Sequence, residues 1–218
     1  MEVMKYIDEG YPDLLLFFAG WSASPDSFAR LAVPERTDYW VVYDYRDVAF
    51  PEFAGYEHVD VVAWSLGVWV AAAVLPAKIP YRRCIAIDGT LLPVNDSYGI
   101  PVPVFKGTLD TLSETNFRKF NARMCGSRDV LQLYGKTVLR PLAEIKAELS
   151  FLYRWILECQ DIAPVFRWTK AIVSSDDRIF PYVNQVRFWE EKAGCPVTVV
   201  NASHYPFYLW KSWQEIVE

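Results

Sequence analysis

The sequence is poor in the residues that build disulfide and metal sites. It contains two histidines and four cysteines, and no two cysteines form a Cys-x-x-Cys pair. Two histidines exclude a histidine-rich metal site, and we expect neither a metal nor a cofactor. The first residues lack the basic-then-apolar order of a secretion signal. We therefore interpret the cysteines as reduced thiols of a cytoplasmic protein.

Long apolar runs and excess positive charge are also missing. No apolar run reaches the ~20 residues that a membrane-spanning helix needs, so no membrane span is expected. The net charge of −5 argues against nucleic-acid binding. Apolar residues make up 52% and aromatic residues 16%, which indicates a folded protein with an apolar cleft or cap beside its core. A chain of 218 residues suits one α/β domain, and we expect a monomer.

One stretch joins a buried strand to a buried helix through a single hydroxyl. Residues 59–64 are mostly apolar and β-branched, and residues 66–75 are rich in alanine without a polar side chain. Ser65 stands between them. Ala63 and Gly67, two positions before and two after it, are small, as a sharp strand-to-helix turn requires. This pattern is typical of the nucleophile elbow of α/β-hydrolases, although its usual first glycine is an alanine here.

Short apolar segments alternate with helix-length segments along most of the chain. We predict a short edge strand at residues 4–7 and buried strands at residues 14–18, 39–43, 59–64, 84–87, 168–173 and 197–200. Helices are expected at residues 28–31, capped by Ser24 or Asp26, and at residues 182–192 and 210–217. This alternation predicts an α/β-hydrolase fold, a mostly parallel sheet with flanking helices.

The segment at residues 95–165 interrupts this alternation. It contains helix-like stretches at residues 114–124 and 142–157, several prolines and no clear strand. We interpret it as a helical cap inserted after the fourth parallel strand. Residues 1–94 and 166–218 then form the α/β-hydrolase core.

A nucleophilic serine needs a base that takes its proton. His204 follows the last predicted strand, where α/β-hydrolases place their base, and the chain order serine, aspartate, histidine is theirs. His58 precedes the strand at residues 59–64 and so belongs to the opposite edge of the sheet. Because sites in open α/β sheets lie beyond the carboxyl ends of the strands, we interpret His58 as a surface histidine.

Three aspartates are candidates for the acid that orients this base. Asp177 follows the strand at residues 168–173 and has the Asp-x-x-x-Pro spacing that is frequent for the acid of α/β-hydrolases. Asp176 is the second choice, because adjacent carboxylates diverge and do not both face one imidazole. Asp88, at the end of an earlier strand, is the third. A solvated loop that caps a helix is the structural alternative for residues 176–177.

The oxyanion of an acyl-transfer reaction needs two backbone N–H donors. Leu66 follows the nucleophile at a helix N-terminus and is expected to supply one of them. The loop after the first long strand should supply the other, which we assign to Trp21. Many lipases have a histidine where Ala19 stands, which weakens a lipase interpretation.

Five segments distributed along the chain form a set. They are LLFFAGWSAS at residues 15–24, YDYRD at 43–47, AWSLGVW at 63–69, FNARMCG at 120–126 and the stretch at 177–189. Together they resemble the BioG-type pimeloyl-acyl-carrier-protein methyl ester esterases, over nearly the whole chain. The resemblance implies hydrolysis of the methyl ester at the far end of a carrier-bound pimeloyl group in biotin precursor synthesis. By the family pattern the triad is Ser65, Asp177 and His204.

A pimeloyl methyl ester is a thin aliphatic chain with a neutral end, so it needs an apolar channel without a counter-charge at the bottom. Candidates for the lining of such a channel are Trp21, Trp64, Phe151 and Trp155. Core packing is the commoner use of these residue types.

Acyl carrier proteins are acidic, so a surface that docks one should be locally basic. The predicted cap is the least acidic part of the chain, and Arg118, Lys119 and Arg123 lie close together on one of its predicted helices. Lys119 and Arg123 are one helical turn apart on the same face. We take these three residues as candidates for partner binding, although surface cations commonly only solvate a protein.

Two other functions fit the same residues. Another small serine esterase, or a thioesterase, would use the same triad, because this chemistry is shared. A non-catalytic acyl-binding protein on the hydrolase fold is an alternative of another class. It would show no covalent labelling of Ser65 by a fluorophosphonate.

Overall fold

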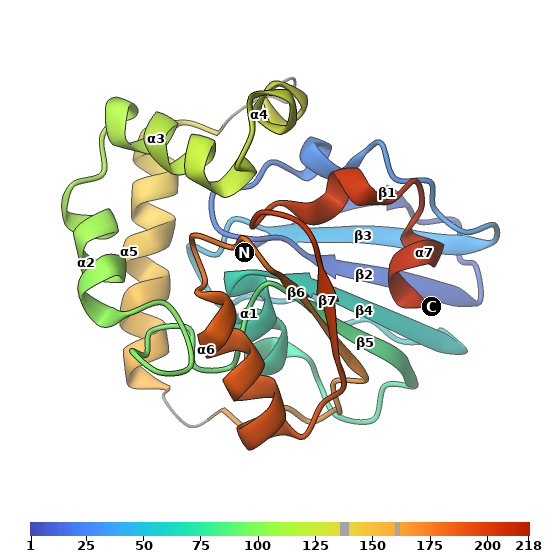
Figure 1. Ribbon diagram of the computed structural model, residues 1–218. Helices are drawn as coiled ribbons and strands as arrows, with labels where there is room; N and C mark the ends of the chain where they lie inside the picture. Colours follow the sequence, from blue (N-terminus) through green and yellow to red (C-terminus); the bar gives the residue numbers. More distant parts are fainter. Residues whose placement is uncertain (136–139, 160–161) are drawn as a thin grey trace.

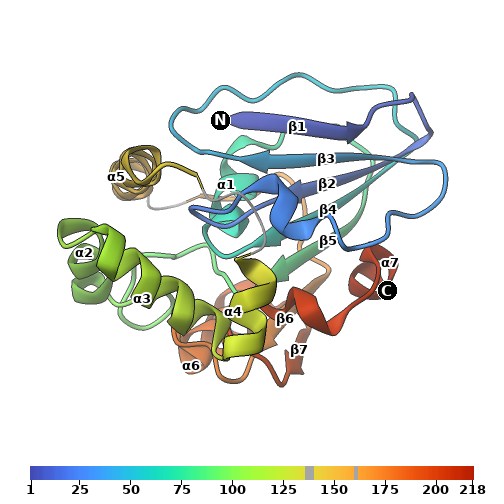
Figure 2. The same cartoon turned by 90° about the horizontal axis from the view of Figure 1, so that it is seen from above.

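A mostly parallel sheet forms the centre of the protein. The computed structural model describes residues 1–135, 140–159 and 162–218. In this part of the chain the sheet has seven strands in the order β1-β3-β2-β4-β5-β6-β7. Only β1 runs antiparallel to its neighbour, and Figures 1 and 2 show it at one edge. The strands span β1 (Glu2–Ile7), β2 (Asp13–Phe18), β3 (Thr37–Tyr43), β4 (His58–Trp64), β5 (Tyr81–Ile87), β6 (Lys170–Ser174) and β7 (Val197–Val200).

Aromatic side chains cover both faces of the central strands. On one face of β2, Phe17 packs against Phe28 and Trp213, with ring centroids 4.5 Å and 4.7 Å away. On the other face, Phe18 stacks on Phe50 at 5.7 Å. Burial on both faces leaves residues 14–18 of β2 no position for a polar side chain, which explains their continuous apolar sequence. The predicted α/β-hydrolase architecture is confirmed.

The prediction of a helix at residues 28–31 is wrong. The chain instead forms a short 3₁₀ turn, η1 (Pro25–Phe28). Its N–H groups bond three residues back, from Ala29 to Asp26 and from Leu31 to Phe28, so the chain turns over the sheet and does not continue as an α-helix. Ser24 precedes the turn but accepts no capping bond with its side chain.

The other elements beside the sheet lie close to their expected positions. The elbow helix α1 (Leu66–Val74) follows β4 directly. Helix α6 (Tyr182–Arg187) continues as the π-helical segment η2 (Phe188–Ala193), so the two together cover the expected helix. The closing segment is a 3₁₀ turn, η3 (Pro206–Leu209), followed by α7 (Trp213–Val217), which begins three residues later than expected because Ser212 caps it.

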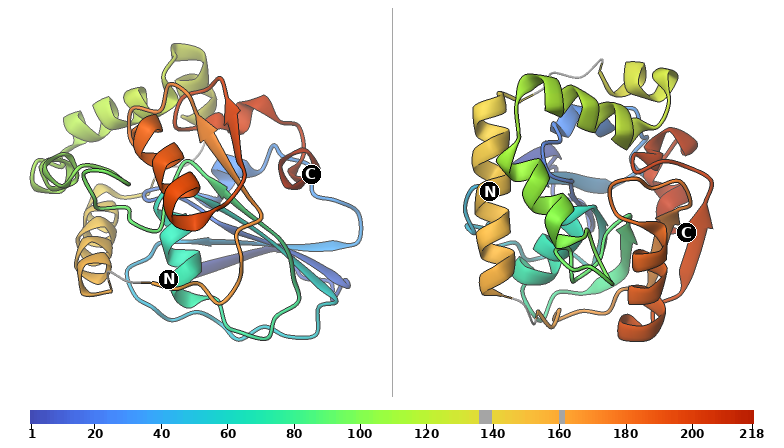
Figure 3. Two further views of the ribbon diagram at one scale, coloured as in Figure 1. Left: turned by 60° about the horizontal axis from the view of Figure 1, so that its bottom comes forward. Right: turned by 60° about the vertical axis from the view of Figure 1, so that its left-hand side comes forward.

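Between β5 and β6 the described residues form four further helices. They are α2 (Val102–Asp110), α3 (Glu114–Cys125), α4 (Arg128–Tyr134) and α5 (Leu142–Glu158). Figures 1 and 3 show them gathered at one end of the sheet, with the long α5 beside α2 and α3. The predicted cap at residues 95–165 also includes residues 136–139 and 160–161, which lie outside the described residues. Its division from the core as a separate domain stays a prediction.

Helix α5 packs onto the core through aromatic rings and a hydrogen bond. Trp155 meets Trp69 of α1 edge to face, with ring centroids 4.8 Å apart. Nearer the start of α5, the carbonyl of Ile145 accepts the indole N–H of Trp21 at 2.8 Å. These contacts hold the helices over the carboxyl ends of the strands. Of the helices that the structure describes, none is both long and apolar enough to cross a membrane.

Candidate active site

Ser65 lies on a sharp turn between β4 and α1. Its φ of 58° and ψ of −128° are strained for a residue with a side chain. The Ser65 N–H donates to the carbonyl of Ile87 at 2.9 Å, which fastens the turn to β5. Gly67 must be small, because a Cβ there would lie 2.5 Å from the carbonyl oxygens of Phe18 and Ala19. The elbow pattern therefore has a direct steric cause.

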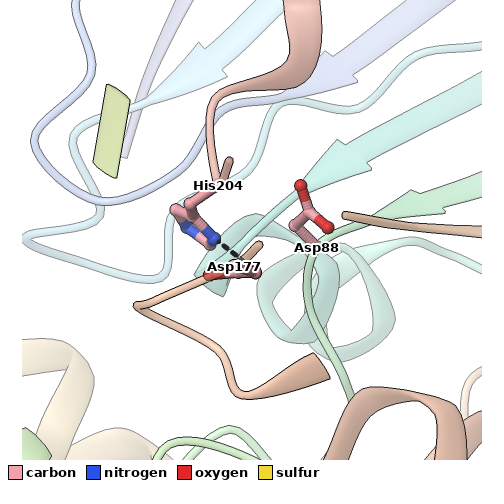
Figure 4. A group of neighbouring side chains, drawn as sticks. All are labelled: Asp88, Asp177 and His204. Carbon is pink, nitrogen blue, oxygen red and sulfur yellow. Dashed lines mark hydrogen bonds and ion pairs between the residues drawn. The ribbon is translucent and has the colours of Figure 1, made fainter. Parts of the chain in front are cut away.

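The structure brings the side chains of Ser65, His204 and Asp177 together. Nε2 of His204 lies 2.9 Å from Oγ of Ser65, and Nδ1 lies 2.7 Å from Oδ2 of Asp177. All three are buried, and Figure 4 shows the imidazole directed at the Asp177 carboxylate. His58, in contrast, is exposed at the other end of β4 and lies 3.1 Å from Asp13, as expected for a surface histidine.

The Asp177 carboxylate is surrounded by hydrogen-bond donors. Besides His204, it accepts the N–H groups of Ile179 at 2.8 Å and Phe180 at 2.9 Å and the side-chain amide of Gln185 at 2.9 Å. These donors fix the carboxylate in the plane that faces the imidazole. Asp176, the second candidate, is exposed and pairs with Arg178 at 3.1 Å, away from His204.

Asp88, the third candidate, is buried behind the triad. Its carboxylate accepts the backbone N–H and the hydroxyl of Ser174, both at 2.6 Å, and makes no hydrogen bond to His204 among the described residues. Figure 4 shows it beside Asp177 but directed elsewhere. Burial, with the neighbouring Asp177 charge, raises the pKa of Asp88 well above its ordinary value, against the opposing bonds from Ser174.

Asp88, Asp177 and His204 also form the one group of described residues spaced like metal ligands, since their ligand atoms lie within 4.8 Å of one another. The hydrogen bonds already described occupy these atoms: Asp177 and His204 bond each other, and Ser174 engages both oxygens of Asp88. Such an arrangement suits an acid that orients an imidazole better than a cation site.

Two backbone N–H groups border the space above Ser65. Leu66 is the first residue of α1, and Trp21 follows Gly20, whose backbone passes so close that a Cβ there would lie 3.1 Å from the Ser65 Cβ. Within the described part of the chain, neither the Leu66 nor the Trp21 backbone N–H donates a hydrogen bond. Both donors are thus available to an oxygen bound at Ser65.

An apolar cavity opens at the triad, with about 560 Å³ of empty space including its mouth. Trp21 and Trp64 line it, as expected, but Phe151 and Trp155 do not. Those two rings pack on each other, and Trp155 also packs on Trp69 of the core. The cavity is lined by Trp21, Trp64, Ser65, Leu66, Ile100, Val104, Phe105, Thr108, Phe120, Arg123, Met124, Leu149, Arg178, Ile179 and His204.

The three cations proposed for partner binding lie on α3. Arg118, Lys119 and Arg123 are all exposed, and none of them forms an ion pair with a described residue. Only Arg123 reaches the cavity, where Arg178 is a second cation. Lys119 and Arg123 also line a second depression, between α2 and α3.

Three residues of this site are not singled out by the sequence. Gln185 donates to Asp177 from α6, and the Phe180 ring stacks on the His204 imidazole at 6.1 Å. Gly89 lies against the elbow, where a Cβ would be 2.3 Å from the Ser65 carbonyl oxygen. A glycine directly after a strand end is a weak signal for such close contact. Nothing in the sequence marks Gln185 or Phe180.

Comparison with known proteins identifies related chains. The family model described as pimeloyl-ACP methyl esterase BioG matches residues 1–216. An uncharacterized protein of Haemophilus influenzae is 38% identical over 213 residues, which cover 97% of each chain. A malonyl-[acyl-carrier protein] O-methyltransferase of Bacteroides fragilis is 40% identical over 184 residues, 82% of this chain but 37% of that protein. The crystal structure of BioG from Haemophilus influenzae superimposes with a TM-score of 0.93 and 37% identity over the whole of both chains.

The raised pKa of Asp88 predicts a pH dependence of stability. A carboxyl that holds its proton more tightly in the folded protein stabilises the fold fully below its unfolded pKa of about 3.9. That contribution is lost as the pH rises toward the folded pKa. Asp88→Asn cannot ionise, so its free energy of unfolding should gain on that of the wild type as the pH rises above about 4, by at most about 1.4 kcal/mol per pH unit. Urea denaturation at several pH values measures the difference.

The exposed neighbour provides the control for this experiment. Asp176→Asn removes a carboxylate that is exposed and that pairs, among the described residues, only with Arg178. Its stability should follow the wild type at every pH. Parallel curves for Asp88→Asn and the wild type would contradict the raised pKa.

Proposed function

Because this chain belongs to the BioG family of pimeloyl-ACP methyl esterases, we propose that it hydrolyses the methyl ester of a pimeloyl group carried by an acyl carrier protein, with Ser65 as the nucleophile. The observation that supports this most directly is the hydrogen-bonded series from Ser65 through His204 to Asp177, bordering an apolar cavity. The series provides a nucleophile, a base and an orienting acid. The cavity provides a site for an aliphatic acyl chain.

Hydrolysis proceeds through an acyl-enzyme. Oγ of Ser65 attacks the ester carbonyl while Nε2 of His204 takes its proton, and Asp177 stabilises the imidazolium that forms. The N–H groups of Trp21 and Leu66 hold the oxyanion. His204 then returns the proton to the leaving methoxide, so methanol departs. A water molecule, deprotonated by the same imidazole, releases the free carboxylate and restores Ser65.

The cavity suits the neutral ester better than the acid that is formed. Most of the side chains that line it are apolar, among them Trp64 and Leu149. An ester end enters such a wall without a counter-charge, whereas a carboxylate loses hydration there. The new charge therefore favours release of the product. The cations Arg123 and Arg178 also line the cavity and suit the acidic carrier.

The Bacteroides relative supports a carrier-bound methyl ester as the substrate. Its name describes methyl transfer to malonyl-acyl carrier protein, a reaction that creates a methyl ester on a carrier-bound acyl group, and this chain matches 37% of its length. An esterase of the proposed kind removes such a methyl group from the carrier-bound acyl chain. Activity on other small esters or on thioesters is the remaining alternative, and the rates on carrier-bound and free esters decide between them.

Removing the nucleophile tests the proposal. Ser65→Ala should fold normally and lose ester hydrolysis by several orders of magnitude, because only the oxyanion donors and substrate binding remain. The rate of hydrolysis of the carrier-bound ester measures this, and mass spectrometry of the intact wild type should show one adduct after incubation with a fluorophosphonate. A variant with more than about a tenth of wild-type kcat would remove Ser65 from the mechanism, and so would an unlabelled wild type.

The acid is tested by three isosteric substitutions. Asp177→Asn should lower kcat far more than Asp176→Asn, because only Asp177 bonds the His204 imidazole. Asp88→Asn, whose carboxylate bonds Ser174 instead, should keep most of the activity. Steady-state kinetics of the three variants gives the ranking. A large loss for Asp88→Asn alone would move the acid to the earlier strand.

Docking of an acidic carrier on α3 is tested by charge reversal. Glu in place of Arg118, Lys119 or Arg123 should raise KM for the carrier-bound ester, since attraction between the two surfaces becomes repulsion. Turnover of a small free ester should stay the same for the reversals at Arg118 and Lys119, which do not line the cavity. Added salt should weaken the carrier-bound reaction more in the wild type than in the variants. Measurements of kcat/KM for both substrates at low and high salt give these values.

A charge reversal far from the cap provides the matched control. Lys211 is exposed and lies two residues before α7, a helix that Figure 1 shows on the opposite side of the molecule from α2 and α5. Lys211→Glu should therefore leave both substrates unaffected. Equal losses on the two substrates for the α3 variants would mean that these cations support folding, and docking there would be rejected.

A further inference from the structure

A buried charge cluster joins α5 to the loop after β3. The side chain of Glu148 is fully buried and lies 2.7 Å from the Arg140 guanidinium. Arg140 also lies 2.7 Å from the buried carboxylate of Asp44, which Arg46 grips with two further bonds. Glu144, one turn before Glu148, is partly exposed and approaches Arg46 at 3.5 Å. Burying a carboxylate costs free energy of hydration, which is offset only when its oxygens are all engaged in hydrogen bonds or ion pairs.

The carboxylate of Glu148 accepts two backbone N–H groups that belong to the core. One is that of Tyr45, at 3.0 Å, and the other is that of Ser22, at 3.3 Å. The Tyr45 hydroxyl in turn donates to the carbonyl of Ala19 at 2.7 Å. Ser22, at one end of the turn at residues 19–22, is therefore bonded to Glu148 directly. Ala19, at the other end, is connected to Glu148 through Tyr45.

This turn is strained and lies against the nucleophile. Ser22 has a φ of 68°, in the left-handed region, and such conformations persist only where surrounding contacts impose them. Gly20 within the turn passes close to Ser65, and Trp21 lines the cavity beside it. The side chain of Trp21 is anchored to Ile145 on the same face of α5, three residues before Glu148. Helix α5 thus holds Trp21 by its ring and the backbone next to Trp21 by a carboxylate.

We propose that Glu148 is a positioning residue for the oxyanion hole, whose buried carboxylate holds the turn at residues 19–22 so that the Trp21 N–H stays directed at the reacting carbonyl oxygen. This role rests on the proposed function. Through Glu148, helix α5 contributes to the positions of the catalytic groups as well as to the acyl cavity. Glu148 does not touch the substrate, and Arg140 keeps its carboxylate oriented.

The substitution Glu148→Gln tests this role with little change in volume. An amide has one acceptor oxygen, so it cannot serve both the Ser22 and Tyr45 N–H groups and also Arg140. Loss of an oxyanion donor costs roughly a hundred- to a thousandfold in kcat, and misdirecting one should cost about ten- to a hundredfold. We expect kcat on a small soluble ester to fall by that factor, with KM changed by less than about twofold, because the interaction is made in the transition state.

Ligand binding separates positioning from folding. A boronic acid that forms a tetrahedral adduct with Ser65 should bind Glu148→Gln more weakly by a similar factor, whereas the free acid product should bind as it does to the wild type. Glu144→Gln makes the same change one turn earlier on α5, at a partly exposed side chain, and should match the wild type in both measurements. All rates are expressed per folded molecule, from the folded fraction measured by circular dichroism.

Two results would overturn the role. One is a lower melting temperature with unchanged kcat per folded molecule, which would make Glu148 a purely structural ion pair. The other is a raised KM with unchanged kcat, which would place its effect in the acyl cavity. If Glu148→Gln does not fold, Glu148→Asp takes its place, because it keeps the charge beside Arg140 but is one methylene shorter. The same comparison of kcat per folded molecule with KM and melting temperature then decides. Full activity of Ser65→Ala would instead reject the proposed function, so the two failures are distinguishable.

Discussion

The active site depends on the backbone of Ser65 being held in a conformation that an isolated chain avoids. A positive φ at a residue with a side chain costs of order 1–3 kcal/mol, which the surrounding structure must offset. The bond from Ser65 to Ile87 and the close packing of Gly67 and Gly89 hold the turn between β4 and α1 in place. The hydroxyl thereby lies within hydrogen-bond distance of His204. The first N–H of α1 donates no hydrogen bond to any residue that the structure describes.

The helices between β5 and β6 stabilise the loops that complete this site. Ser203 and Tyr205, on either side of His204, bond carbonyl groups of Cys125 and Met124 at the end of α3. Helix α5 bonds Trp21 and Ser22 beside the nucleophile. The segments that carry His204 and Trp21 are therefore both attached to these helices, the first to α3 and the second to α5. Movement of these helices would alter catalytic geometry together with access to the cavity.

Patterns of local origin were predictable from the sequence. The central strands contain continuous apolar runs because the sheet is covered there on both faces, and Phe17 and Phe18 show one side chain for each face. The elbow is recognisable because steric limits at Ala63 and Gly67 act within five residues. The predictions at residues 28–31 and at Phe151 and Trp155 failed for one reason: propensity and apolar character do not tell which neighbour a side chain meets. Trp155 is an apolar residue of the predicted cap, yet its ring packs against Trp69 and does not line the cavity.

The sequence by itself determined the positions of the strands along the chain, the serine at the elbow and the short set of acids and bases that could serve it, because these follow from periodicity and from residue type at strand ends. It could not choose among Asp88, Asp176 and Asp177 with certainty. Only the tertiary structure decided which carboxylate meets the imidazole, through the bonds of Ile179, Phe180 and Gln185 to Asp177. The tie between Glu148 and Ser22 joins residues 126 positions apart, and contacts at such a distance arise from packing, which no local pattern records.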